Sequence, residues 1–194
     1  MTTNATAKRT IDWGKRLPDL AVVLLILVAL GAGWLLKTGV ENRSQAFSGG
    51  GVSAQVPAGW LRLNPSGSEV LHAIDRSASG FSTTYLIEAL PVAADAQPGQ
   101  VASLVTLARG KALTAYRVLN QQDVLVQGQK ATEIEYVYVE SAANLSHAIY
   151  PAVVHGLDFI FIQNGKATIV GYRADQAAFD ADLGRFYRFL VTVK

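Results

Sequence analysis

The sequence LAVVLLILVALGAGWLL, residues 20–36, divides the chain into two unequal parts. It contains no charged and no strongly polar side chain, and eleven of its residues are leucine, isoleucine or valine. A helix of this length rises about 26 Å, which is close to the hydrocarbon thickness of a bilayer. The pattern predicts a single transmembrane helix over residues 20–36, with membrane lipid as the first partner.

The charges that flank this run predict its orientation. The whole chain has a formal net charge of +2, and all of that excess precedes residue 20, although Lys37 and Arg43 follow the run closely. Lysine and arginine near a span favour the cytoplasmic side. We therefore expect residues 1–19 to form a cytoplasmic polar tail and the domain to be extracytoplasmic, on a single-pass protein of the cell (plasma) membrane. The basic residues of the tail are Lys8, Arg9, Lys15 and Arg16.

Two kinds of residue in this region suggest contacts within the membrane. Trp13 and Trp34 suit the headgroup level, where tryptophan is enriched. A patch of small residues would let a neighbouring transmembrane helix approach closely. The residues of this patch are Ala29, Gly31, Ala32 and Gly33.

Two other interpretations of the apolar run compete with a retained anchor. The first is a cleaved secretory signal, since Ala29-Leu30-Gly31 and Ser44-Gln45-Ala46 match a small-residue cleavage site. The former site lies inside the apolar run and the latter far beyond it, so the anchor is favoured. The second is a buried core helix, which normally carries a polar stripe that this run lacks.

Composition limits what the remaining part of the chain does. About 150 residues follow the apolar run, the usual size of one domain. They are neutral overall and show no basic stripe, which argues against a nucleic-acid partner. Cysteine is absent from the chain, which excludes disulfides, thiolate catalysis and Cys-ligated metals. The low charged fraction of 16% suggests that another protein covers part of the surface.

The patterns after the run predict one α+β domain. Residues 37–51, which include a glycine triplet, resemble a flexible tether, and the domain follows over residues 52–194. Trp60 follows the first strand and is placed to cover the core. Apolar residues at helical spacing predict a helix over 100–113. Alternation and turn residues predict strands over 52–56, 71–77, 81–90, 118–126 and 129–140. The last two are expected to form a hairpin that turns at Gln127-Gly128.

The clearest local signal is a β-hairpin near the end of the chain. Residues 159–163 and 166–172 flank Asn164-Gly165, the pair that a type I′ turn favours. A last helix follows, with Asp175 as its expected cap and an apolar stripe for packing on the sheet. The fold class is therefore α+β, with a mostly antiparallel sheet packed by two main helices. The stripe consists of Phe179, Leu183, Phe186 and Leu190.

Two segments of the domain resemble a known family. Val52-Ser-Ala-Gln-Val-Pro-Ala-Gly-Trp60 is similar to the strand and P-x-G-W entry of the PsbP-like fold, shared by the photosystem II extrinsic protein and a Ran-binding nuclear-transport factor. Val124–Tyr136, the hairpin and the last helix also resemble it. The resemblance covers residues 47–194. It implies a largely non-enzymatic domain that binds or assembles beside a larger membrane complex.

Few residues suggest chemistry, and we identify no catalytic, cofactor-binding or metal-binding set. His72 and His155 each lie near an aspartate, but a histidine bonded to its neighbour is the more common situation. Glu133 and Glu135 share a strand face at a separation that glycosidases use, yet alternation makes them the solvated side of a half-buried strand. Four tyrosines could line a groove or pack a core, and core packing is favoured: Tyr85, Tyr136, Tyr138 and Tyr150.

Three functions remain open from the sequence. The first is a non-catalytic accessory or assembly subunit, anchored beside other subunits of a membrane complex. The second is a tethered extracytoplasmic module that binds a small ligand in a pocket between the sheet and a covering helix. The third, a hydrolase using His72 or His155, has the least support. No cofactor is expected.

Overall fold

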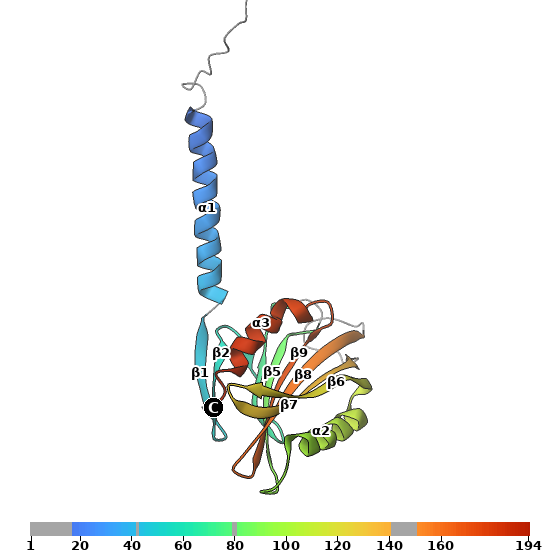
Figure 1. Ribbon diagram of the computed structural model, residues 1–194. Helices are drawn as coiled ribbons and strands as arrows, with labels where there is room; N and C mark the ends of the chain where they lie inside the picture. The colour runs from blue at the N-terminus through green and yellow to red at the C-terminus, as the bar shows by residue number, and fades with distance from the viewer. Residues whose placement is uncertain (1–16, 42, 79–80, 141–150) are drawn as a thin grey trace, which may run out of the picture. The chain divides into compact units, whose positions relative to one another are not determined.

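The computed structural model describes residues 17–41, 43–78, 81–140 and 151–194. The chain divides into two units, Met1–Arg43 and Ser44–Lys194. The first unit contains the helix α1, Leu17–Glu41 (Figure 1). Within the described part of the chain, no helix meets the length and hydropathy expected of a membrane span.

The segment that links α1 to the domain differs from its prediction. The helix continues to Glu41, and residues Ser44–Gly49 form the strand β1, which pairs in antiparallel fashion with β2, Val52–Pro57. The flexible tether predicted over 37–51 is therefore wrong for these residues. Gly50 and Gly51, both with positive φ, form the tight turn of this hairpin rather than part of a loose linker.

The main sheet of the domain is antiparallel throughout. Its described strands lie in the order β3-β4-β5-β9-β8-β7-β6, so β9, near the end of the chain, lies between β5 and β8 (Figure 1). This confirms the α+β class with an antiparallel sheet. The strands are β3 Leu61–Arg62, β4 Glu69–Ile74, β5 Thr84–Pro91, β6 Thr114–Val126, β7 Gln129–Glu140, β8 Ala152–Gln163 and β9 Lys166–Asp175.

The two predicted hairpins have the expected turns. Asn164 and Gly165 between β8 and β9 have φ of 52° and 71°, and Gln127 and Gly128 between β6 and β7 have φ of 51° and 81°. Positive φ at both central residues defines a type I′ turn, whose twist matches that of the strands. Both hairpins are confirmed.

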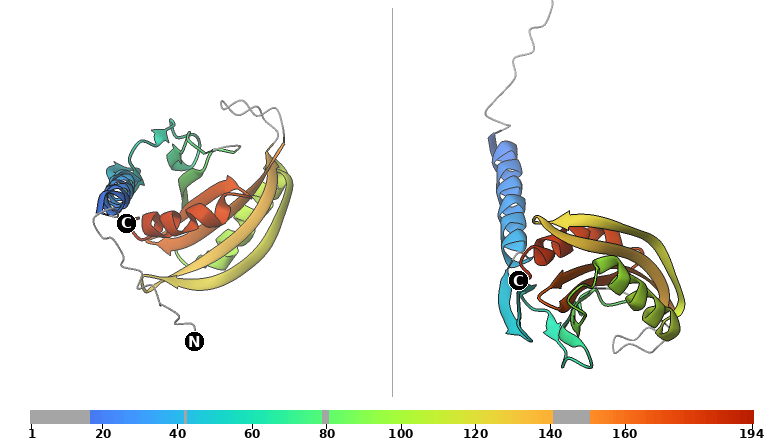
Figure 2. Two further views of the ribbon diagram at one scale, coloured as in Figure 1. Left: turned by 90° about the horizontal axis from the view of Figure 1, so that it is seen from above. Right: turned by 60° about the horizontal axis from the view of Figure 1, so that its bottom comes forward.

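The sheet has a hydrophobic core on each face. One core contains Phe186 and Leu190 of the helix α3, Phe179–Leu190, together with Val52 and Val56 of β2. Trp60 packs against this core, with its ring centroid 4.3 Å from that of Tyr85, as predicted. The other core contains the buried side of the helix α2, Pro98–Ala112. Figure 2 shows the two helices on opposite sides of the sheet.

The start of α3 corrects one prediction. Ala178, not Asp175, is the N-cap residue. The carboxylate of Asp175 instead accepts a hydrogen bond from the backbone N–H of Ala177 at 3.0 Å, two residues along. Asp175 still belongs to β9, so its side chain forms a turn between strand and helix. The apolar stripe of the helix is confirmed: Phe179, Phe186 and Leu190 are buried and Leu183 packs against them.

The last residues of the chain hold the β1–β2 hairpin. The backbone N–H of Ser53 donates to the carbonyl of Lys194, and the N–H of Lys194 donates to the carbonyl of Ser53, both at 2.9 Å. Thr192 adds a third bond, because its hydroxyl accepts from the N–H of Gln55 at 2.9 Å. The hairpin that follows α1 is thus tied to the chain end that follows α3.

Candidate functional site

A cleft of about 430 Å³ lies on the α2 side of the sheet, over β4, β5 and β9. Its volume falls within the range of about 300–1,000 Å³ typical of small-molecule sites. Apolar and polar side chains both contribute to it. Its lining consists of Leu61, Leu63, His72, Ile74, Arg76, Phe81, Ser82, Thr84, Tyr138, Glu140 and Arg173.

The position of α2 leaves this part of the face open. The helix begins at Pro98, whose fixed φ suits a first turn, and the side chain of Gln100 accepts a hydrogen bond from the N–H of Gln97 at 3.1 Å. Val101, Ala102 and Val105 bury the apolar stripe of the helix. The helix packs mainly on β6, β7 and β8, and none of its residues is among those that line the cleft.

A buried ion pair joins the end of α2 to the centre of the sheet. Arg109 continues the buried stripe of the helix, and its Nη1 pairs with Oδ2 of Asp158 on β8, which is fully buried. Nη2 of Arg109 also lies 3.3 Å from Oε1 of Glu88 on β5. The desolvation of such a pair largely offsets its attraction, so its net contribution to stability is small, whereas removing one partner alone is costly.

Tyr136 and Arg173 extend the ion pair toward the cleft. The hydroxyl of Tyr136 donates to Oδ1 of Asp158 at 3.4 Å and accepts from Nε of Arg173 at 3.2 Å. The guanidinium of Arg109 lies over the Tyr136 ring, 5.1 Å from its centroid. Burial acts to raise the pKa of Tyr136, but Arg109 and Arg173 outweigh it and lower that pKa below its ordinary value.

Arg173 connects this buried network to the cleft that it lines. Burial acts to lower the pKa of Arg173, but Tyr136 and Tyr138 outweigh it and raise that pKa above its ordinary value, so the side chain stays cationic. Within the described residues Arg173 forms no ion pair. Burial raises the pKa of Tyr138 to about 12, so its hydroxyl stays protonated at neutral pH.

His72 and His155 are bonded to neighbouring carboxylates, as the sequence favoured, whereas Glu133 and Glu135 are half-buried and bonded rather than simply solvated. Nδ1 of His72 lies 3.4 Å from Glu69, although His72 also lines the cleft. Nε2 of His155 lies 2.8 Å from Oε1 of Glu135, and its ring stacks on Phe179 with centroids 3.6 Å apart. Glu133 accepts a hydrogen bond from Gln122 at 3.0 Å. Among the described residues, no group of three or more His, Asp or Glu is placed to hold a metal.

The tyrosines occupy both cores and do not form one groove. Tyr85 is fully buried among the aromatic rings of α3, where burial raises its pKa well above the ordinary value. Tyr136 and Tyr138 are buried on the opposite face, and Tyr138 also lines the cleft. Core packing is therefore confirmed for these three tyrosines, and Tyr150 lies outside the described residues.

The four small residues predicted to pack in the membrane lie on one helix but not on one face. Ala29, Ala32 and Gly33 are spaced i, i+3 and i+4 and so share a face, whereas Gly31 lies on another side of α1. A Cβ added at Gly31 or Gly33 would meet no atom within 4 Å, so the space for a neighbouring helix is open. Trp34 is exposed on the same helix. Trp13 lies outside the described residues.

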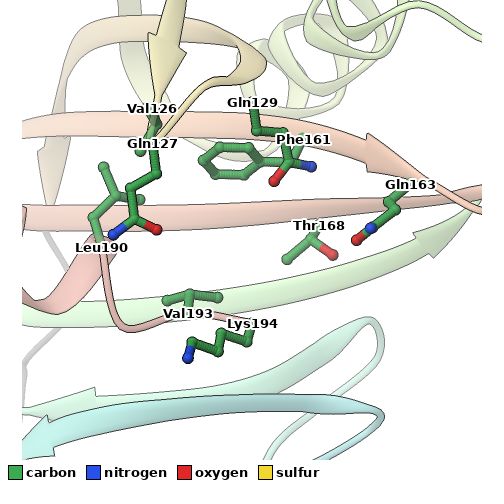
Figure 3. Close-up of a pocket in the computed structure, with 9 residues that line it drawn as sticks. All are labelled: Val126, Gln127, Gln129, Phe161, Gln163, Thr168, Leu190, Val193 and Lys194. Atoms are coloured by element: carbon green, nitrogen blue, oxygen red, sulfur yellow. The ribbon is translucent and has the colours of Figure 1, made fainter.

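Two other hollows have less of the character of a binding site. One of them, of about 80 Å³, is lined by residues that include Gln127 and Phe161. Figure 3 shows the side chain of Gln127 extending from the β6–β7 turn toward Leu190. The amide of Gln127 donates to the carbonyl of Val191 at 3.1 Å, so this polar group is already bonded within the domain. A third hollow, about 910 Å³ and broadly open, lies beside the start of α2 and the exposed Leu125.

Sequence reasoning missed the residues that connect α2 to the cleft. Arg109 stands four residues after Val105 on the buried stripe, and Asp158 stands inside an apolar strand. A charge at a position that periodicity assigns to the core is the signal that could have identified them. Nothing in the sequence indicated that Arg173 would lie beside Tyr136.

Comparison with known proteins supports the fold. No family model matches the chain, and no curated protein matches its sequence. The cyanobacterial PsbP (CyanoP) of Synechocystis sp. PCC 6803 aligns with a TM-score of 0.58 and 13% identity, over 78% of this chain and 92% of that one. The domain therefore has a PsbP-like fold, which confirms the resemblance seen over residues 47–194.

Two further structures align less closely. The Ran-binding protein Mog1p of Saccharomyces cerevisiae gives a TM-score of 0.49 at 10% identity, over 78% of this chain and 94% of that one. LpqN of Mycobacterium tuberculosis, involved in cell envelope biogenesis, gives a TM-score of 0.48 at 13% identity, over 79% of this chain and 92% of that one. We draw no conclusion from these two alignments.

Proposed function

We propose that this chain is a single-pass, membrane-anchored accessory subunit, in which α1 anchors a PsbP-like domain that binds or caps a larger membrane protein complex. The domain is non-catalytic in this proposal. The N-terminus is cytoplasmic and the domain lies outside the plasma membrane. In this proposal the partners of the chain are membrane lipid and the other protein subunits of the complex. It has no nucleic-acid partner.

The observation that carries this proposal is the exposure of the apolar side chains of α1. Its large hydrophobic residues from Val22 to Leu36 are 51–72% exposed, on every side of the helix. Large contiguous apolar surfaces mark sites that bind a protein or a membrane. Lipid favours such a surface, because each leucine, isoleucine or valine near the centre of a span contributes about −0.3 to −0.6 kcal/mol to insertion.

The length of the uncharged sequence run within α1 is also compatible with an anchor. Its side chains are described without interruption from Ala21 to Lys37, and the uncharged run of the sequence begins one residue earlier, at Leu20. Seventeen residues lie at the short end of the range for transmembrane helices. The basic residues before Leu20 support the cytoplasmic position of the N-terminus.

Extraction of the full-length chain from its native membrane tests the anchor. We expect the intact chain to stay in the membrane pellet after an alkaline carbonate wash. A matched variant, Leu27→Arg, places a charge at the helix centre at a cost of about 3 kcal/mol and should release part of the chain. Release of the intact wild-type chain into the wash would contradict the retained anchor. So would a chain in the pellet that has been cleaved after Gly31 or Ala46.

Purification in mild detergent tests the accessory role separately. We expect other membrane proteins to co-purify with the full-length chain in fixed stoichiometry. A chain that always returns alone and monomeric, while still resisting carbonate, would contradict the accessory role and leave the anchor in place.

A small-ligand-binding module is the second candidate function. It is favoured by the cleft over β4, β5 and β9, whose lining combines apolar side chains with Arg173 and Thr84, which are cross-strand neighbours. Pockets with a few convergent polar groups are the usual small-molecule sites. This candidate is compatible with the anchor, because one domain can bind a ligand while it is held at a membrane.

A further inference from the structure

The charges of the cleft favour an anion. Its lining contains two arginines, Arg76 and Arg173, against one glutamate, Glu140, so the described charged groups leave an excess of one positive charge when His72 is neutral. A cleft lined by one excess sign of charge concentrates ligands of the opposite sign. The ligand is therefore expected to be negatively charged.

Arg173 is the group best placed to receive that charge. Within the buried network, Arg173 donates one hydrogen bond, from Nε to the hydroxyl of Tyr136. Its side chain forms no ion pair within the described residues. Arginine presents five N–H donors in a planar fork, so both terminal nitrogens keep donors for a ligand. A carboxylate or a phosphate can accept two of them in parallel, which is the strongest arrangement for either group.

The network behind Arg173 holds it in place for this role. Tyr136 accepts from Nε of Arg173 and donates to Asp158, and Asp158 is in turn paired with Arg109. These side chains come from β9, β7, β8 and α2, so strands and a helix fix the guanidinium rather than a loop. A side chain fixed by its surroundings loses less entropy when a ligand binds.

The walls of the cleft indicate what the rest of the ligand is. Leu61, Ile74 and Phe81 contribute apolar surface to the lining, and Ser82 and Thr84 contribute polar groups. Leu61, Ile74, Thr84 and Arg173 follow one another across β3, β4, β5 and β9. The volume of about 430 Å³ is near the lower end for small-molecule sites, so the apolar body is small.

We propose that this cleft binds a small amphipathic anion, whose carboxylate or phosphate group pairs with Arg173 and whose apolar body packs on Leu61, Ile74 and Phe81. This inference rests on the ligand-binding candidate above and is independent of the membrane anchor. The two anionic groups share one recognition chemistry, and the experiment below distinguishes them.

Titration of the full-length chain in detergent micelles with three related probes tests the proposal. Benzoate carries the carboxylate, phenyl phosphate carries the phosphate, and benzamide is the neutral isostere. NMR detection of the arginine Nε–H signals, with that of Arg173 assigned from Arg173→Lys, reports contact at the proposed residue. We expect a saturable shift of this signal with benzoate or phenyl phosphate, with a Kd below about 10 mM.

Benzamide should bind at least about tenfold more weakly than the better anion, which corresponds to 1.4 kcal/mol. If benzoate and phenyl phosphate have different dissociation constants, the probe that binds more tightly identifies the anionic group of the ligand. Equal binding of benzamide and both anions would overturn the anion inference while leaving a ligand-binding module. No saturable shift with any of the three probes would overturn the inference as well.

Two surface variants keep the test independent of changes to the core. Leu61→Glu adds a negative charge at the cleft, and the matched control Leu125→Glu adds one at an exposed position outside it; these leucines are 40% and 70% exposed. We expect Leu61→Glu to weaken anion binding about tenfold by like-charge repulsion and Leu125→Glu to leave it unchanged. Equal effects of the two variants would overturn the proposal.

Discussion

Gly156 on β8 lies opposite Tyr136 on β7, and the tyrosine ring fills the space that a side chain at Gly156 would occupy. A Cβ at this glycine would overlap the ring, which is fully buried. The same arrangement recurs one strand further, because Gly171 on β9 lies opposite Asp158 and a Cβ there would come within 2.8 Å of its carboxylate. Two glycines therefore make room for the buried network.

We expect Gly156→Ala to destabilise the domain. Alanine in a strand is normally better than glycine, but here the ring of Tyr136 must move, at a cost of about 1–3 kcal/mol. Urea denaturation of the full-length chain in detergent measures the loss. Gly184→Ala is the matched control, since its Cβ meets nothing within 4 Å on α3 and the change should stabilise by about 0.5–1 kcal/mol. Equal values for both variants would show that the ring is not confined.

Asp158→Asn should destabilise the domain strongly. The substitution leaves the guanidinium of Arg109 buried without its closest partner, which typically costs about 3–5 kcal/mol. Glu88 still lies 3.3 Å from Arg109, so the lower end of that range is expected. The same denaturation experiment applies, with Glu133→Gln on β7 as control. Glu133 is half-buried and forms no ion pair among the described residues, and a glutamine there can still accept the hydrogen bond from Gln122, so we expect a change of no more than about 0.5 kcal/mol. If Asp158→Asn leaves the free energy of unfolding unchanged, Glu88 alone is a sufficient partner for the guanidinium of Arg109.

Stability should fall at high pH, and Tyr138 should account for part of the fall. Burial raises its pKa to about 12, above the value of about 10 in an unfolded chain. The stabilisation is complete below pH 10 and is lost as the pH rises toward 12. We expect Tyr138→Phe to reduce this fall by about 2–3 kcal/mol. Denaturation midpoints measured from pH 9 to pH 12 check this, and identical slopes in both chains would contradict it.

Thr192→Val should loosen the β1–β2 hairpin. The threonine hydroxyl accepts from the backbone N–H of Gln55, so valine removes one bond between the chain end and β2 at a cost of about 0.5–1.5 kcal/mol. Hydrogen exchange of the Gln55 amide should accelerate, while that of Ser53, bonded to the backbone of Lys194, should change much less. Equal acceleration at both amides would mean that the whole segment detaches together.

Gly33→Ile should weaken association of α1 with a neighbouring helix. Gly33 shares a face with Ala29 and Ala32, whereas Gly31 does not, and close packing in membranes depends on small residues on one face. Co-purification from mild detergent should fall about tenfold for Gly33→Ile, a change of 1.4 kcal/mol, and remain unchanged for the control Gly31→Ile. Loss with both variants, or with neither, would contradict a helix interface on that face.

Local patterns predicted the elements of the domain well because their causes are local. The β8–β9 hairpin follows from Asn164-Gly165, whose backbone preferences select the turn without any distant contact. The stripe of α3 follows from helical spacing, so its buried side could be read from the sequence alone. The cap of α3 could not be assigned in this way, because Asp175 also belongs to a strand of the sheet.

The strand β1 was missed for a physical reason. Residues 44–49 are mostly exposed and carry no strong alternation, so their extended form depends on pairing with β2. The position of β2 depends in turn on the last residues of the chain, which bond Ser53 from more than 130 positions away. A preference that arises only from distant partners leaves little trace in a short segment.

The sequence by itself determined the apolar run of α1, the order and type of most elements, and the PsbP-like resemblance. Only the tertiary structure decided the candidate site. Arg109, Tyr136, Asp158 and Arg173 belong to one helix and three different strands, and the strand order β9-β8-β7 brings them together. Strand order depends on hydrogen bonds between backbones, which are the same for every residue type, so no spacing of side chains along the chain could reveal this meeting.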